Sequence, residues 1–411
     1  GFVVPFVSLS IGELGIDQLK LDEAKPLTLG VYMVIIRDLQ AAQPRLNGKI
    51  DLPGLSQPVE VYRDEYGIPH IKAANWHDAF FAQGFITAQD RLWHMEYDRL
   101  RGSGRWAEAV GASAIDQDIM MRRFRLEASA RSDYQALSGR AKEMMDAYSE
   151  GVNAFIDTAD ALPVEYGITG LTPEPWQPWD GLIAYKVRHI QMGVFESKVW
   201  RAQMVRKLGP DKVAAMWPGY QSGQLQVLPP GAPYPGPLDD GLESLRRGAA
   251  AINSLQETDS GSNSWVVSGS RTASGKPILA GDSHRALDTP SVYYQNHLAC
   301  PDFDVVGASF PGMPAFAHFG HNDSVAWCVT HTAADYQDLY IEQFREPSNA
   351  GNSRYYLYQG QWLRAEVFQE CIQVRGGDNV DIQVFVTHHG SVISDSPQSG
   401  TGIAFRYTAT D

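Results

Sequence analysis

The chain has 411 residues, 44% of them hydrophobic and 11% aromatic, and a formal net charge of −14 at pH 7. This composition excludes a disordered chain, and the length exceeds what one hydrophobic core usually holds, so we expect two lobes. The negative charge gives no basic surface for nucleic acid and disfavours binding to anionic membranes. Three cysteines are too few for a disulfide framework.

Residues 1–48 are predicted to be irregular. They begin at Gly1 with an apolar stretch that is compatible with the remnant of an export signal, but a basic flank and a clear cleavage site are missing. The longest early apolar run covers residues 30–36, which is far short of the ~20 residues that span a bilayer. We therefore expect no membrane span.

Residues 49–218 are predicted to be mainly helical after two short strands. Apolar and polar residues alternate over residues 59–64, and a turn separates them from a second strand at 68–71. Apolar side chains at three- and four-residue spacing predict helices over 78–101 and 141–158. A further helix begins near Asp180. On the first helix, we expect Asp90 and Arg91 to form a structural ion pair.

The next segment, residues 219–261, has the Pro- and Gly-rich composition of a linker. From Ser262 onward the pattern changes to strands. A turn at residues 270–275 predicts a hairpin between Trp265 and Ala280, and further strands are expected over 302–310, 315–321, 324–332 and 384–389.

The junction between linker and strands carries the most informative motif, Gly-Ser-Asn-Ser-Trp at residues 261–265, with Gly-Asp-Ser-His at 281–284 on the return strand. A serine hydroxyl is a weak nucleophile and needs a nearby base. A serine released as a new N-terminus can use its own α-amine, whose reference pKa is ~7.7–8.0. The preceding glycine tolerates the backbone geometry of an N-to-O acyl shift.

These motifs resemble the penicillin acylase family of N-terminal nucleophile hydrolases, in which a precursor cuts its own backbone before a serine. The resemblance covers residues 50–209 and, most specifically, residues 262–344, which are most like cephalosporin and glutaryl-cephalosporin acylases. It implies an α+β fold, the αββα four-layer sandwich, with a largely helical α-chain region at 49–218. It also implies cleavage at Gly261–Ser262, a spacer at 219–261 and a catalytic β-chain that begins at residue 262.

The resemblance also implies roles for single residues. Ser262 is the nucleophile, its α-amine is the base, and His284 orients the serine. The backbone N–H of His331 is one oxyanion donor, a group that stabilises the tetrahedral intermediate by several kcal/mol. The family's second oxyanion donor lies more than two hundred residues after the nucleophile, beyond Asp411. The chain therefore resembles a fragment of a longer acylase, with residues 262–411 as the truncated start of the catalytic domain.

The family's acyl pocket is matched by residues from both sides of the cleavage point: Met192, Phe195, Tyr293, His318 and Phe319. Glutaryl-preferring members carry arginine at the place of His318. Because histidine has an ordinary pKa of ~6.5, a substrate carboxylate held by His318 would bind less tightly as pH rises through that value. The alternative within the family is an N-acyl-homoserine-lactone acylase, which has a long apolar pocket.

Catalysis of this kind needs no cofactor, but the resemblance implies a structural calcium ion. Asp335 and Asp338 match two carboxylates that hold calcium in penicillin G acylases, and Glu196 is a third candidate. Hard oxygen ligands suit Ca²⁺. The implied partners are a small acyl amide substrate and, after self-cleavage, an α/β heterodimer. The family is typically exported, which implies a periplasmic location.

Two interpretations from other classes compete with the acylase. His318-x-x-His321 and Cys328-x-x-His331 contain the side chains of a zinc module. On strands, however, residues three apart point to opposite faces, which argues against a shared metal. The other competitor is a non-catalytic relative that keeps the fold but never cuts itself.

Overall fold

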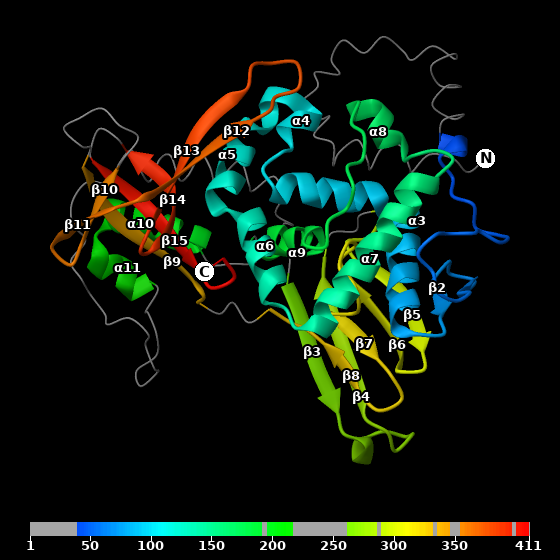
Figure 1. Ribbon diagram of the computed structural model, residues 1–411. Coiled ribbons are helices and arrows are strands. Elements are labelled where there is room, and N and C mark those ends of the chain that lie inside the picture. The colour runs from blue at the N-terminus through cyan, green and yellow to red at the C-terminus, as the bar shows by residue number, and fades with distance from the viewer. Residues whose placement is uncertain are drawn as a thin grey trace, which may run out of the picture.

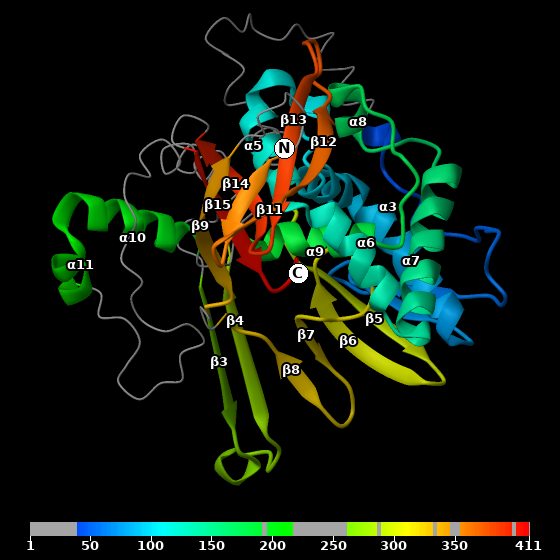
Figure 2. The same ribbon diagram turned by 60° about the vertical axis from the view of Figure 1, so that its left-hand side comes forward.

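The computed structural model describes residues 39–190, 195–216, 261–285, 289–331, 335–345, 354–396 and 400–410. Helices α3 and α7 lie over a six-stranded sheet, and a seven-stranded sheet lies on the other side of the helical region (Figures 1 and 2). The hairpin of β3 (Gly261–Val267) and β4 (Ile278–His284) projects from the junction between these layers. The architecture is α+β, as predicted. Within the described residues, no helix is both long and apolar enough to cross a membrane.

The helical core is built on the pair α3 (Trp76–Gly102) and α7 (Gly139–Thr158). A Cβ on Gly84 would lie 2.0 Å from the Tyr148 carbonyl oxygen, and one on Gly151 would lie 1.8 Å from that of Phe81. Only glycine therefore allows the two helices to touch backbone to backbone. The apolar stripe predicted for α3 is buried around this contact, with Phe81, Leu92 and Met95 almost fully covered.

The remaining helices extend from this pair. They are α4 (Ala107–Val110), α5 (Ile115–Phe124), α6 (Leu126–Ala136), α8 (Val164–Thr169), α9 (Asp180–Ile190), α10 (Phe195–Leu208) and α11 (Pro210–Met216), with 3-10 turns at Gly111–Ala114 and Gly269–Arg271. The helix predicted from Asp180 is described as far as Ile190, and residues 191–194 lie outside the described residues.

The six-stranded sheet joins segments that are far apart in the sequence. Its order is β1-β2-β5-β6-β7-β8, with β1 (Glu60–Arg63), β2 (Pro69–Lys72), β5 (Tyr294–Cys300), β6 (Phe303–Ser309), β7 (Phe319–His321) and β8 (Ala326–Cys328). Strands β2 and β5 pair in parallel, with His70 opposite His297. The segments before and after Gly261 therefore share one sheet.

The seven-stranded sheet is formed by the C-terminal part of the chain. Its order is β11-β10-β9-β15-β14-β13-β12, with β9 (Gln337–Arg345), β10 (Tyr355–Tyr358), β11 (Gln361–Arg364), β12 (Glu366–Ile372), β13 (Val380–Thr387), β14 (Gly390–Ser396) and β15 (Thr401–Tyr407). Helix α10 packs against β9 through the buried Val199. Figures 1 and 2 place α10 on the opposite side of this sheet from α3.

The prediction for Asp90 was wrong in its partner. Asp90 forms an ion pair with Arg63 of β1 at 2.8 Å, and the hydroxyl of Tyr294 donates to the same carboxylate at 2.6 Å. The guanidinium of Arg91 instead lies 5.6 Å from the centre of the Tyr294 ring. Asp90 thus connects α3 with strands on both sides of Gly261, which is a structural role.

Candidate active site

The predicted nucleophile lies on the hairpin formed by β3 (Gly261–Val267) and β4 (Ile278–His284). The register places His284 opposite Gly261 and Ser283 opposite Ser262. A Cβ on Gly261 would lie 3.2 Å from His284 Nδ1, so the imidazole rests against the residue that precedes the serine. The other ring nitrogen, Nε2, lies 3.2 Å from Asp282 Oδ2.

The hydroxyl of Ser262 lies in a directed hydrogen-bond network with Thr330 and His331. The Thr330 hydroxyl donates to the Ser262 carbonyl oxygen at 3.0 Å, and the two side-chain oxygens are 2.6 Å apart. Either hydroxyl can donate across this contact; when Thr330 donates to the carbonyl oxygen, the Ser262 hydroxyl donates to Thr330 Oγ1. The backbone N–H of His331 donates to Ser262 Oγ at 3.2 Å. The serine hydroxyl thus lies against Thr330, a residue that the sequence motifs did not single out.

Three of the predicted pocket residues gather in one aromatic cluster. Tyr293 lies 5.4 Å from His318 and 5.0 Å from Phe319, measured between ring centroids. Phe310 joins them, stacked on Tyr293 at 5.4 Å and 4.2 Å from His318. The structure thus brings together side chains from the loop before β5, the end of β6 and the start of β7.

Helix α9 contributes two further rings from the segment before Gly261. Tyr185 stacks on His189 at 4.1 Å and lies 5.4 Å from His318. Both residues were missed in the sequence, where the candidates on this side were Met192 and Phe195. Met192 lies outside the described residues, and Phe195 begins α10 with a side chain that is also outside them. The periodicity that marked Met192 would have reached His189 one turn earlier.

The electrostatics of the cluster correct the expectation for His318. This histidine is only 4% exposed and contacts Ser309 Oγ at 3.1 Å, and its burial lowers its pKa to about 4. Burial lowers the pKa of His189 to about 4 as well. Both rings are therefore neutral at neutral pH. A cation lies beside the cluster: the Arg285 guanidinium is 5.7 Å from the Tyr293 centroid and 3.3 Å from its hydroxyl.

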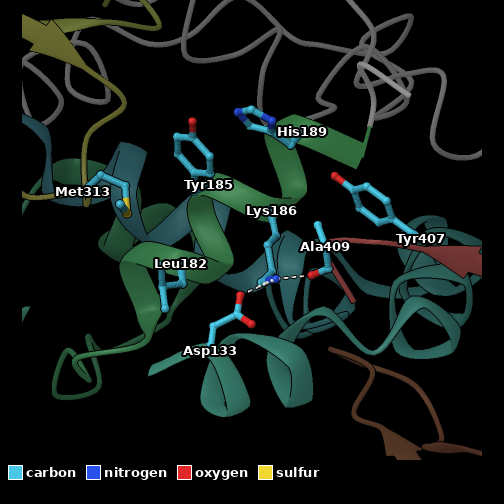
Figure 3. Close-up of a pocket in the computed structure, with 8 residues that line it drawn as sticks. All are labelled: Asp133, Leu182, Tyr185, Lys186, His189, Met313, Tyr407 and Ala409. Atoms are coloured by element: carbon cyan, nitrogen blue, oxygen red, sulfur yellow. Dashed lines mark hydrogen bonds and ion pairs between the residues drawn. The ribbon is translucent and has the colours of Figure 1, made fainter. Parts of the chain in front are cut away.

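A cavity of about 290 Å³ borders this cluster (Figure 3). It shares Tyr185 and His189 with the aromatic rings, and its remaining lining is Asp133, Leu182, Lys186, Met313, Tyr407 and Ala409. The Lys186 ammonium at its wall is neutralised by Asp133 at 2.7 Å and donates to the Ala409 carbonyl. The free volume beside the cluster is thus bounded by apolar and neutralised groups.

Comparison with known proteins places this arrangement in a family. Residues 58–411 match the family model described as penicillin amidase. The chain belongs to the penicillin amidase family. It is 42% identical over 376 residues to penicillin acylase 2 proenzyme of a Pseudomonas species, covering 90% of this chain and 48% of that protein.

Two further members of the family illustrate its range. An acyl-homoserine lactone acylase of Pseudomonas aeruginosa is 31% identical over 385 residues, which cover 88% of this chain and 44% of that enzyme. Penicillin G acylase of Escherichia coli is 27% identical over 410 residues, covering 85% of this chain and 47% of that protein. The chain spans about half the length of the curated relatives it matches.

The carboxylates predicted to bind calcium are occupied by a lysine. Lys198 Nζ lies 2.5 Å from Asp335 Oδ1 and 2.6 Å from Asp338 Oδ1. Calcium requires six to eight oxygen ligands, and an ammonium group offers donors only. The side chain of Glu196 lies outside the described residues. Among the described residues, both carboxylates have the ammonium group of Lys198 as a partner.

The side chains of the zinc interpretation have separate partners. His318 is buried beside Ser309, whereas His321 is exposed. Cys328 Sγ lies 3.1 Å from Ser264 Oγ, and His331 Nε2 lies 3.2 Å from the Tyr336 hydroxyl. No group of three or more potential metal ligands occurs among the residues that the structure describes. The geometry does not support a zinc module.

Proposed function

We propose that this chain carries the nucleophile of an amidohydrolase that cuts the acyl side chain from a linear amide of the penicillin or cephalosporin type. The observation that carries the proposal is a hydrogen bond at Ser262, the residue that directly follows Gly261. Its hydroxyl accepts a hydrogen bond from the backbone N–H of His331 at 3.2 Å. An N–H beside the nucleophile is suitably placed for the oxyanion that forms when the serine attacks a carbonyl.

The first step is self-cleavage. Ser262 Oγ attacks the carbonyl carbon of Gly261, the C–N bond breaks, and the resulting ester is hydrolysed by water. This releases the α-amine of Ser262 and produces an α/β heterodimer. The hydroxyl proton passes to the Ser262 nitrogen as the C–N bond breaks, and Thr330 Oγ1, 2.6 Å from Ser262 Oγ, is positioned to relay it. His284, opposite Gly261, is proposed to orient the serine.

In the second reaction the same hydroxyl attacks a substrate amide. The free α-amine takes the hydroxyl proton and passes it to the leaving amine, and the His331 N–H stabilises the oxyanion. Water then hydrolyses the acyl-serine ester. Every group named here belongs to the chain, so no cofactor takes part in the proposed chemistry.

The acyl group is proposed to lie against Tyr293, His318 and Phe319, with Met192 and Phe195 as further candidates from the sequence. Arg285 favours an acyl group with a distal carboxylate, because a guanidinium binds carboxylates through a planar array of donors. The second candidate function is an acyl-homoserine-lactone acylase, which the likeness to the Pseudomonas aeruginosa enzyme favours. Glutaryl, phenylacetyl and decanoyl amides separate the two: hydrolysis of decanoyl but not glutaryl amides would select the second.

The boundaries predicted from the sequence are part of the proposal: an α-chain at 49–218, a spacer at 219–261 and a catalytic chain from 262. We further propose that the complete enzyme has the αββα sandwich fold and is periplasmic. The hairpin supports the sandwich fold. Trp265 is 52% and Val266 69% exposed, and these neighbouring side chains point to opposite faces of β3. Exposed apolar strand faces are normally covered by further layers, as both would be in the sandwich. Residues 1–38 and 217–260 lie outside the described residues.

The decisive experiment uses Ser262→Ala in the complete protein. The wild type is expected to yield a chain that begins Ser-Asn-Ser-Trp on N-terminal sequencing, and the variant should remain one unbroken precursor without amidase activity. A wild-type protein that stays uncut yet hydrolyses amides would disprove the N-terminal-nucleophile mechanism.

A further inference from the structure

The contact between Lys198 and two aspartates joins the two sides of the cleavage point. Lys198 lies on α10, before Gly261, whereas Asp335 and Asp338 lie just before and within β9. The lysine side chain is 26% exposed, so the contact is partly shielded from water. Its neighbour Val199 is buried in the apolar cluster that also contains Phe405 and Tyr407. An ion pair and an apolar contact thus fasten α10 to this sheet.

Both contacts are charge-assisted hydrogen bonds: Lys198 Nζ lies 2.5 and 2.6 Å from the two carboxylates. A calcium ion that used both carboxylates would have to displace the ammonium group. Burial alone would lower the pKa of Lys198, but hydrogen bonds and charge from Asp335 and Asp338 outweigh it and raise the pKa. The lysine therefore carries its positive charge at neutral pH.

The two aspartates flank a residue that contacts the candidate active site. Tyr336 follows Asp335, and its hydroxyl lies 3.2 Å from His331 Nε2. The backbone N–H of the same histidine donates to Ser262 Oγ. Tyr336 also stacks on Tyr407 at 5.6 Å. A short series of contacts leads from Lys198 through the aspartates and Tyr336 to the proposed oxyanion donor.

We propose that Lys198 is a built-in cation that takes the structural place of a metal ion, holding α10 to the Asp335–Asp338 segment and positioning His331. The role of Lys198 in holding α10 to this segment is independent of the proposed function, whereas the effect of Lys198 on turnover rests on it. Lys198 is a positioning residue: it acts through Tyr336 and His331 and is not placed in contact with the substrate.

The test compares the complete wild-type protein with Lys198→Met, Lys198→Glu and a control, Lys207→Met, which removes an exposed lysine from the same helix. In the wild type, EDTA or millimolar CaCl₂ should shift the melting temperature by less than about 1 °C, and metal analysis should find no retained calcium. Lys198→Met should melt roughly 3–6 °C lower because two carboxylates lose their counter-charge. The control should melt with the wild type.

Turnover provides the second measurement. Lys198→Met should lower kcat about tenfold with KM within about twofold, because the oxyanion donor acts in the transition state. Lys198→Glu adds a third carboxylate, so its melting temperature should fall further and recover with calcium but not magnesium. If neither the wild type nor any variant hydrolyses an amide, the proposed function of Ser262 is contradicted. The melting and calcium measurements would still decide whether Lys198 has the structural role.

Two results would overturn the proposal. One is a wild-type protein that retains one equivalent of calcium and melts at a lower temperature after EDTA. The other is a Lys198→Met protein that melts with the wild type and the Lys207→Met control.

Discussion

The helix pair α3–α7 and the hairpin β3–β4 are held in opposite ways. The helices touch through backbone at Gly84 and Gly151, and the side chains around them are almost fully buried. The hairpin exposes Trp265 and Val266, and polar contacts position Ser262. The scaffold therefore tolerates almost no change of shape, whereas the hairpin depends on a few hydrogen bonds. Substitutions in the first region should affect folding, and those in the second should affect chemistry.

The largest effect is expected at Gly151. In Gly151→Val, the new Cβ would start 1.8 Å from the Phe81 carbonyl oxygen, so α3 and α7 must separate. We expect a loss of more than about 4 kcal/mol of unfolding free energy, measured by denaturant titration of the complete protein. Gly139→Ala on the same helix is the control, since nothing lies within 4 Å of its Cβ position. Equal stability of both variants would contradict the close helix contact.

A smaller, purely chemical effect is expected at Thr330. Thr330→Val keeps the shape of the side chain but removes the group that accepts from Ser262 Oγ and donates to its carbonyl. Self-cleavage, followed by the disappearance of the precursor on gels, should slow by about tenfold or more, equivalent to ~1.4 kcal/mol or more. The melting temperature of the precursor should change by less than about 2 °C. Thr330→Ser retains the hydroxyl and should cleave at nearly the wild-type rate.

The next prediction concerns the loss of stability at acidic pH. It tests whether the aromatic cluster around His318, like the helix pair, contributes to the free energy of unfolding. His318 has a pKa of about 4 in the folded protein because it is buried, against an ordinary value of ~6.5 when unfolded. The unfolded chain thus binds the proton first as pH falls. Stability contributed by the neutral ring is complete above about pH 6.5 and is lost toward pH 4, by on the order of 3 kcal/mol.

The measurement is the free energy of unfolding at pH 7 and at pH 4.5 for the wild type and His318→Phe. The variant should lose less stability on acidification, whereas His321→Asn, at an exposed position at the end of β7, should follow the wild type. If His318→Phe loses as much unfolding free energy between pH 7 and pH 4.5 as the wild type does, the imidazole is already protonated or solvated in the folded state.

The sequence predicted long elements well and short ones poorly. Helices expected over 78–101 and 141–158 are observed at Trp76–Gly102 and Gly139–Thr158, because a long apolar stripe leaves little choice. The strands expected over 315–321 and 324–332 shrink to Phe319–His321 and Ala326–Cys328. An apolar run of a few residues indicates that the segment is buried, but it does not distinguish a strand from a buried loop.

The candidate site was predictable where chemistry follows sequence spacing. The hairpin register opposes His284 and Gly261, as expected from the two strands on either side of the connection at residues 268–277. The partners of Asp90, the rings of Tyr185 and His189 and the lysine between the aspartates come from segments distant in the chain. Their meeting depends on how helices and sheets pack. The neutral state of His318 likewise follows from burial, which residue identity alone does not reveal.

The parallel pairing of β2 with β5 has a consequence for the life of the molecule. If the backbone is cut at Gly261–Ser262 as proposed, the two pieces would still share a ladder of main-chain hydrogen bonds, and neither could leave without breaking the sheet. Refolding after denaturation would then require two separate polypeptides to meet, without the high effective concentration that one chain provides. The uncut chain would therefore refold more readily than the cut one, and thermal damage after cleavage would be harder to reverse.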